Sequence, residues 1–62
     1  MIDIKTIETA RKKLHISKYE MSKRLNKSTQ SYYDIVRRKS TTIETLKKIG
    51  VILNLDPKEL IL

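Results

Sequence analysis

The sequence predicts an all-α fold, a compact domain of five short helices that spans residues 1–62. Its apolar residues recur at spacings of three and four, as in amphipathic helices, and no strand pattern competes. One Gly and one Pro leave room for tight turns but for no linker. A chain of 62 residues can support only one core. With no Cys and a single His, neither a disulfide nor the usual set of zinc ligands can stabilise it, so the helices must hold together by packing.

The first helix is expected from about Asp3 to Leu14. One side of it should enter the core, and this side consists of Ile4, Ile7, Ala10 and Leu14. The polar residues between them should face outward, namely Lys5, Glu8, Arg11 and Lys12. We expect His15 to meet the free carbonyls at the end of this helix rather than to bind a metal.

The second helix has the clearest start signal. Ser17 followed three residues later by Glu20 is a capping box, and Ile16 before the cap can pack on Met21 after it as a hydrophobic staple. Asn26 follows the last apolar residue of the segment, at a position where asparagine often adopts the left-handed conformation. We therefore expect a sharp turn after the second helix.

Two further helices follow this turn. Ser28 can cap a third helix that runs to about Val36, and Thr41 with Glu44 offers a capping box for a fourth. The apolar stripe of the fourth helix should form much of the core, and it comprises Ile43, Leu46, Ile49 and Leu53. Gly50 in the same helix could admit a close neighbouring helix.

A short fifth helix is predicted near the C-terminal end. Asp56 can cap it, Pro57 suits its first position, and Glu59 is the third helical residue. Leu55 and Leu60 are spaced as a hydrophobic staple. These signals together predict a fifth helix that begins at Pro57.

Positive charge is concentrated in the middle of the chain. The formal charge is +7, and residues 11–39 carry ten Lys or Arg against two acidic residues, so this segment accounts for +8 and the rest for −1. A localised positive field attracts polyanions, so nucleic acid or an acidic membrane surface is the leading class of partner. The alternative is a surface that only keeps the protein soluble.

Membrane insertion is not expected. The longest uncharged apolar stretch covers residues 49–55, whereas a helix needs about 20 residues to span a bilayer. The N-terminus carries Asp3 rather than the basic region of a signal peptide. We therefore expect a soluble cytoplasmic protein with no membrane partner.

The third helix carries the best candidate for a functional surface. At about 100° per residue, five polar side chains share one face, namely Thr29, Gln30, Tyr33, Asp34 and Arg37. The opposite side should anchor the helix, and it comprises Ser31, Tyr32 and Ile35, with Val36 at the boundary. A helix held in this way, after another helix and a tight turn, can enter the major groove of DNA and present its N-terminal residues to base edges.

Three side chains of this face are suited to contact bases. The amide of Gln30 can donate and accept at once against N6 and N7 of adenine, and Thr29 could touch a thymine methyl group. Tyr33 could contact a base, a methyl group or a phosphate, or it could pack over neighbouring side chains with no partner bound.

The charged and hydroxyl residues around this face are expected to form ion pairs or to contact phosphates. Asp34 could accept a hydrogen bond from cytosine N4, but the favoured interpretation is an ion pair with Arg37 or Arg38. Contacts to phosphates position a protein without reading sequence. The residues suited to such contacts are Lys18, Lys27, Ser28, Arg37, Arg38, Lys39, Thr41 and Thr42.

The segment from Ile16 to Leu60 resembles the Cro/CI-type helix-turn-helix family, also called the Xre family. ISKYEMSKRLNKSTQSYYDIV falls on the two-helix unit and IETLKKIGVILNLDPKEL on the fourth and fifth helices. The usual apolar positions are filled by Met21, Leu25, Tyr32 and Ile35. This chain departs from the family pattern at three positions. Asn26 stands where the family usually has the turn glycine, Val36 where it often has glutamate, and Arg38 where it often has glycine.

The resemblance implies a lambda-repressor-like fold whose third helix, from Ser28, is the recognition helix. It implies base reading at Thr29, Gln30 and Tyr33 or Asp34, and a backbone contact at Lys18. Members of the family commonly bind double-stranded DNA as homodimers, often through the region of the fifth helix, where this chain has Leu60, Ile61 and Leu62. The implied function is sequence-specific DNA binding and transcriptional regulation, as a repressor that occludes a promoter.

Two other functions remain open at this point. The same fold could serve as a protein-interaction module, as in an antitoxin or antirepressor, or the charge could serve nonspecific DNA packaging. An enzyme is not expected, because one His and no Cys cannot assemble a nucleophile, a base and an orienting group, and no phosphate-binding glycine loop is present. We expect no cofactor, no metal and no small-molecule ligand.

Overall fold

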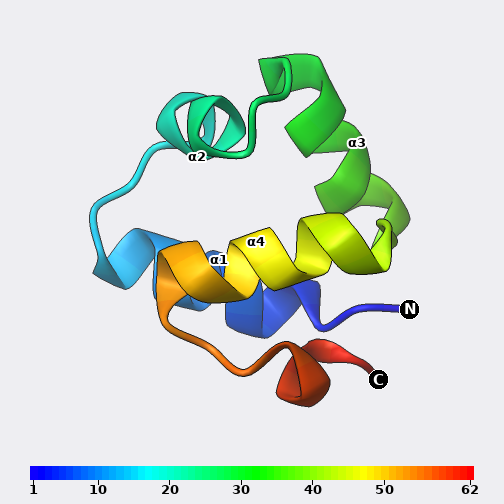
Figure 1. Cartoon of the computed structure of the whole chain (residues 1–62). Coiled ribbons are helices and arrows are strands. Elements are labelled where there is room, and N and C mark those ends of the chain that lie inside the picture. Colours follow the sequence, from blue (N-terminus) through cyan, green and yellow to red (C-terminus); the bar gives the residue numbers. More distant parts are fainter.

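The computed structural model describes all residues, 1–62. Four α-helices and one short 3₁₀ helix follow one another along the chain, α1 (Ile4–Lys13), α2 (Lys18–Arg24), α3 (Thr29–Arg38), α4 (Ile43–Leu53) and η1 (Pro57–Leu60). Figure 1 shows α4 lying across α1, with α2 and α3 on one side of this pair and η1 on the other. The all-α prediction is therefore confirmed, and no helix of the structure has the length and apolarity needed to cross a bilayer.

The prediction of five helices needs a correction, because the segment Pro57–Leu60, although it starts at Pro57 with Asp56 as its cap, forms only four residues of 3₁₀ helix and not a fifth α-helix. Ile61 already has an extended backbone and forms an isolated antiparallel bridge with Ile2. Asp3 N–H also donates to the carbonyl of Leu60 at 2.7 Å. These bonds bring the two ends of the chain together (Figure 1), and the chain leaves η1 in an extended conformation.

A capping side chain starts every helix, as the sequence led us to expect for three of them. The capping residues are Asp3, Ser17, Ser28, Thr42 and Asp56. The expectation of Thr41 was wrong, since it is the Thr42 hydroxyl that accepts from the N–H of Thr45 at 3.2 Å, and α4 starts one residue later. Ser17 caps α2 as predicted, but the Glu20 carboxylate pairs with Arg24 at 2.5 Å instead of completing the capping box.

Three helices end in the same kind of turn, which is the Schellman motif. His15, Asn26 and Asn54 have positive φ angles of 57–58°. In each turn the N–H of the following residue donates to the carbonyl five residues earlier, and for Lys27 the acceptor is the Ser22 carbonyl at 2.9 Å. The sharp turn predicted at Asn26 is thus confirmed. α3 ends differently, in a left-handed Lys39 whose N–H bonds to Ile35.

One core of twelve apolar residues receives side chains from every element, and they are Ile2, Ile4, Ile7, Ile16, Met21, Leu25, Tyr32, Ile35, Leu46, Ile49, Leu53 and Leu60. Two residues expected in it, Leu14 and Ile43, are more than half exposed. Leu14 lies beyond the last turn of α1, where the chain leaves the core face. Ile43 lies roughly 60° to 120° around α4 from the three buried residues of its stripe, so its side chain points to solvent.

Gly50 is buried where α4 meets the chain that leaves it. A Cβ atom at this position would lie 2.6 Å from the carbonyl oxygen of Leu55 and 3.0 Å from Cγ of Pro57. The close neighbours of Gly50 are therefore the turn after α4 and Pro57, the first residue of η1.

Candidate nucleic-acid interface

The two faces of α3 divide as the periodicity predicted. Tyr32 and Ile35 are buried, and through them α3 packs against α2 and the core. On the other face Gln30 and Arg37 are exposed, and Tyr33 is 44% exposed. The remaining two residues of the predicted polar face, Thr29 and Asp34, are half-buried. α3 therefore has a fixed apolar side and a polar side open to a partner.

Asp34 forms the ion pair that was favoured for it. Its Oδ1 lies 2.5 Å from a guanidinium nitrogen of Arg37, one turn along the same helix, and both side chains are more than one third exposed. An exposed pair of this kind contributes little to stability. Its effect on the surface is electrostatic, since the pair leaves Arg38 and Lys39 as the unpaired charges at this end of α3.

Lys18, at the first position of α2, lies against the middle of α3. Its Nζ is 5.0 Å from the centroid of the Tyr33 ring and 3.9 Å from Oε1 of Glu8. The two interpretations of Tyr33 are therefore compatible, because the ammonium group of Lys18 lies over the ring while almost half of the Tyr33 side chain stays exposed. A predicted phosphate contact and a predicted base contact thus lie side by side.

The other candidates for phosphate contact form two groups at opposite ends of α3. Lys27 and Ser28 lie in the turn before the helix, whereas the second group lies in and after its last turn and comprises Arg37, Arg38, Lys39, Thr41 and Thr42. α3 has ten residues, so its two ends, where the groups lie, are about 15 Å apart, compared with a major groove about 12 Å wide. The hydroxyls of Ser28 and Thr42 already accept the capping bonds of α3 and α4.

A buried polar cluster behind this surface was missed in the sequence. Arg11, expected outside, is only 6% exposed, and its guanidinium donates twice to the Glu8 carboxylate, at 2.7 and 3.1 Å, and once to the carbonyl of Ile16 at 2.6 Å. The hydroxyl of the buried Tyr32 donates to the same carboxylate at 2.8 Å. Arg11 can be buried because these acceptors satisfy its charge and N–H groups.

The ionisation of this cluster follows from its contacts. Burial by itself raises the pKa of Glu8, but the hydrogen bonds from Arg11 and Tyr32, with the charges of Arg11 and Lys18, outweigh it and hold the pKa below its ordinary value. Burial, and the hydrogen bond to an anionic partner, raise the pKa of the Tyr32 hydroxyl. At neutral pH the cluster therefore contains a carboxylate, a guanidinium and a neutral phenol.

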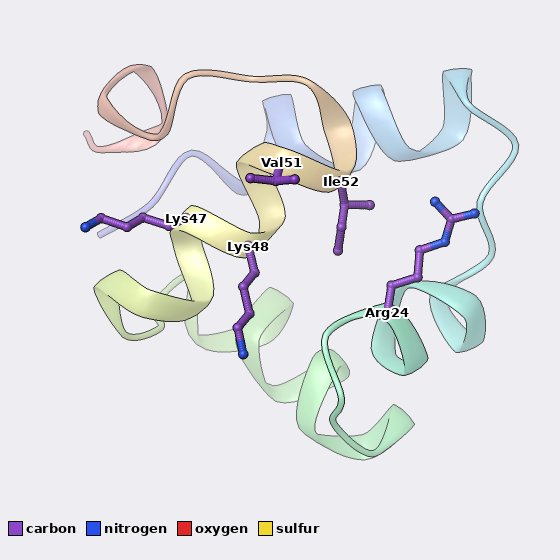
Figure 2. Close-up of a pocket in the computed structure, with 5 residues that line it drawn as sticks. All are labelled: Arg24, Lys47, Lys48, Val51 and Ile52. Carbon is purple, nitrogen blue, oxygen red and sulfur yellow. The ribbon is translucent and has the colours of Figure 1, made fainter.

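A second cationic surface lies between α2 and α4 (Figure 2). Figure 2 shows Lys47, Lys48 and Val51 projecting from α4, with Ile52 directed toward the α2 side, where Arg24 stands. Arg24 is paired with Glu20 there. This shallow hollow has no side-chain amide or hydroxyl that could both donate to and accept from a base edge, so it is less suited to read sequence than α3.

The comparison with known families agrees with the arrangement of the helices. The family model described as helix-turn-helix matches residues 7–60, which extend from α1 to the end of η1. Searches of curated proteins and of solved structures found no match to the chain.

Proposed function

Because the chain belongs to the helix-turn-helix family of the Cro/CI type, whose members are DNA-binding regulators of transcription, we propose that it represses transcription by inserting α3 into the major groove at a promoter. The observation that carries this proposal is the division of α3. Its buried side holds the helix rigidly on α2 and the core, while the polar side remains open along the helix. Two groups of cationic and hydroxyl side chains about 15 Å apart along α3 suit the phosphates on both sides of one groove.

Gln30 is the main base-reading residue of this proposal. It is fully outside the core, in the first turn of α3, and its amide suits the N6 and N7 atoms of adenine. Thr29 contacts a thymine methyl group, and Tyr33 contacts a base or methyl group with Lys18 on its ring. Asp34 stays paired with Arg37 unless a cytosine N4 group replaces that partner.

A homodimer would place two copies of α3 about 34 Å apart, one turn of DNA, in successive major grooves. The C-terminal residues are the proposed contact between the copies, but Leu60 cannot take part because it is buried in the core of its own chain. Ile61 and Leu62 are more than half exposed and are the apolar residues available for it. Occupation of a promoter by such a dimer is the proposed mechanism of repression.

Selection from a pool of random duplexes, followed by sequencing, tests this function. The proposal expects an enriched motif with two related half-sites, and it expects Gln30→Ala to relax one position in each half. Enrichment of no sequence, with salt-sensitive binding to all duplexes, would favour DNA packaging instead. Absence of binding to any duplex by the folded protein would favour the protein-interaction module.

A further inference from the structure

We propose that Glu8 is a positioning residue that raises the sequence specificity of DNA binding, although it lies behind the DNA-contact surface and reads no base. The inference rests on the proposed function. Glu8 belongs to α1, yet its carboxylate contacts both α2 and α3. We call these two sets of contacts arms. The first arm runs from Glu8 to Tyr32 on the buried face of α3, and the second runs from Glu8 through Lys18 to Tyr33 on the exposed face.

The carboxylate itself is held in place. Two N–H groups of Arg11 donate to its two oxygens, and a third donates to the carbonyl of Ile16 in the turn between α1 and α2. Arg11 is almost fully buried, and the Glu8 side chain is 15% exposed. Two charge-assisted hydrogen bonds and low exposure to solvent restrict the motion of this carboxylate, so it can fix the positions of the helices that contact it.

The first arm fixes α3 through Tyr32. Its hydroxyl donates to Glu8 at 2.8 Å, and no part of the side chain is exposed. Tyr32 and Gln30 lie roughly 160° apart around α3, so the bond and the base-reading amide are on nearly opposite sides of the helix. Any rotation of α3 about its axis that stretches this bond also moves Gln30 relative to the base edges.

The second arm reaches the exposed face through Lys18. The ammonium group lies 3.9 Å from Glu8 and 5.0 Å from the Tyr33 ring centroid, so Glu8 and Tyr33 attract it together. This attraction orients Lys18 along the ring of Tyr33. It also competes with phosphate, which lowers the affinity of Lys18 for DNA backbone of any sequence. Phosphate contact is weakened on every sequence, but the orientation of Lys18 and Tyr33 helps only the complex in which Tyr33 meets its base, so both arms increase the ratio of specific to nonspecific affinity.

Two substitutions separate the arms. Tyr32→Phe removes one hydroxyl from the first arm and keeps the ring in the core. Glu8→Gln keeps an oxygen that can accept from Tyr32 but removes the charge that attracts Lys18. Tyr19→Phe is the matched control, because Tyr19 is an exposed tyrosine of α2 outside the cluster. Ile49→Val is the control for stability, because Ile49 is fully buried in α4 and makes none of the polar contacts of the cluster.

The measurement is the affinity of each variant for the duplex enriched by selection and for a shuffled duplex, at a temperature where circular dichroism shows every variant folded. Tyr32→Phe is expected to reduce the ratio of the two affinities by about threefold to tenfold while binding to the shuffled duplex is unchanged. Glu8→Gln is expected to raise affinity for the shuffled duplex by about twofold to threefold. Both controls should keep the wild-type ratio.

The outcomes separate this inference from the proposed function. A wild-type protein without preference for any duplex overturns both. A selective wild type whose Tyr32→Phe and Glu8→Gln variants keep its ratio overturns the positioning role alone, and lower melting temperatures would then show a purely structural cluster. Should one variant fail to fold, the other decides, since each arm has its own readout.

Discussion

The turn from α2 to α3 and the turn from α4 to η1 have the same backbone, yet they lead to very different elements. Each places a left-handed Asn after a Leu, at Asn26 and at Asn54. In each the next N–H bonds to a carbonyl five residues back, and the residue after that caps the following element. The first turn leads to ten residues of α-helix, and the second leads to four residues of 3₁₀ helix.

The side chains of the two turns explain the difference. After the left-handed residue comes exposed Lys27 in one turn and half-buried Leu55 in the other. The carbonyl five residues back belongs to Ser22 in the first turn and to Gly50 in the second. The turn after α4 therefore packs against α4 itself, at Gly50. The turn after α2 has an exposed residue at the same position, and α3 can present one face to solvent. A shared turn motif sets the direction of the chain, and the residues around it decide whether the next element closes the core or forms a surface.

Among substitutions in the two turns, Gly50→Ala should cause the largest change in the free energy of unfolding. The added methyl group would meet a backbone oxygen at 2.6 Å, and that oxygen cannot move without displacing the turn into η1. We expect a loss of about 2 to 3 kcal/mol in the free energy of unfolding, measured by urea denaturation. Ser22→Ala, at the equivalent position of the other turn, is the control, because it adds no atom and removes only the hydrogen bond from the Ser22 hydroxyl to the Tyr19 carbonyl, so it should lower stability by about 1 kcal/mol or less. Similar losses at both positions would contradict the distinction between the turns.

Glu8 of α1 contacts α2 and α3 through its carboxylate, whereas η1 is joined to the residue before α1 by a backbone hydrogen bond from Asp3 N–H to the Leu60 carbonyl, so acid should affect the two regions differently. The pKa of Glu8 is lowered in the folded state, so its contribution to stability is complete above the ordinary glutamate pKa and is lost as pH falls through the lower folded value. Glu8→Gln should remove about 1 to 2 kcal/mol of stability at neutral pH and flatten the loss of stability that wild type shows as the pH falls below the ordinary glutamate pKa. Asp3, whose pKa is also lowered by bonds with Thr6, should leave a residual slope in the variant. An unchanged pH profile would exclude the ionised form of Glu8 as the source.

The two caps that follow the turns should differ in importance. The Ser28 hydroxyl accepts from the N–H of Ser31 and starts a ten-residue helix, so Ser28→Ala is expected to lower stability by about 1 kcal/mol. Asp56 accepts from the N–H of Lys58 and starts only four residues, so Asp56→Ala should lower it by about 0.5 kcal/mol. Thermal unfolding of both variants checks the order, and a larger loss at Asp56 would reverse it.

A similarly small effect, but a gain in stability, is expected at the left-handed asparagines, where the two turns are alike. Asn26→Gly and Asn54→Gly should each raise stability by about 0.5 kcal/mol, because glycine adopts a positive φ without a steric penalty. Equal shifts in the urea midpoint would confirm that the two turns are one motif. A gain at only one of them would mean that the other asparagine has a contact that the backbone does not explain.

Most of the helix starts and the α2–α3 turn could be predicted from the sequence, because the signals are local. A cap such as Ser28 acts within three residues of its own position, and a left-handed asparagine acts within five. The two faces of α3 followed from the helical repeat for the same reason. The choice between Thr41 and Thr42 could not be made, because adjacent threonines give the same signal and only the backbone decides which hydroxyl meets an N–H.

Arg11 shows what local signals leave out. It lies seven residues after Ile4 and four after Ile7, which is the core stripe of α1, so the spacing did contain a sign of its burial. A cation was nevertheless expected outside, because burial requires acceptors that the spacing does not show. One of these acceptors is nearby in sequence at Glu8, and the carboxylate is shared with Tyr32, 24 residues away. Long-range polar partners of this kind become visible only in the folded chain.

The role of the exposed face of α3 is tested most directly by titrating the selected duplex and its shuffled counterpart with wild type, Gln30→Ala and Thr9→Ala at one salt concentration. Thr9 is an exposed residue of α1 outside the proposed surface and controls for substitution by alanine. If α3 reads bases in the major groove, Gln30→Ala weakens binding to the selected duplex by about fivefold to a hundredfold and leaves the shuffled duplex and the Thr9→Ala variant at wild-type affinity. Equal affinities of wild type and Gln30→Ala for the selected duplex would contradict base reading by this face.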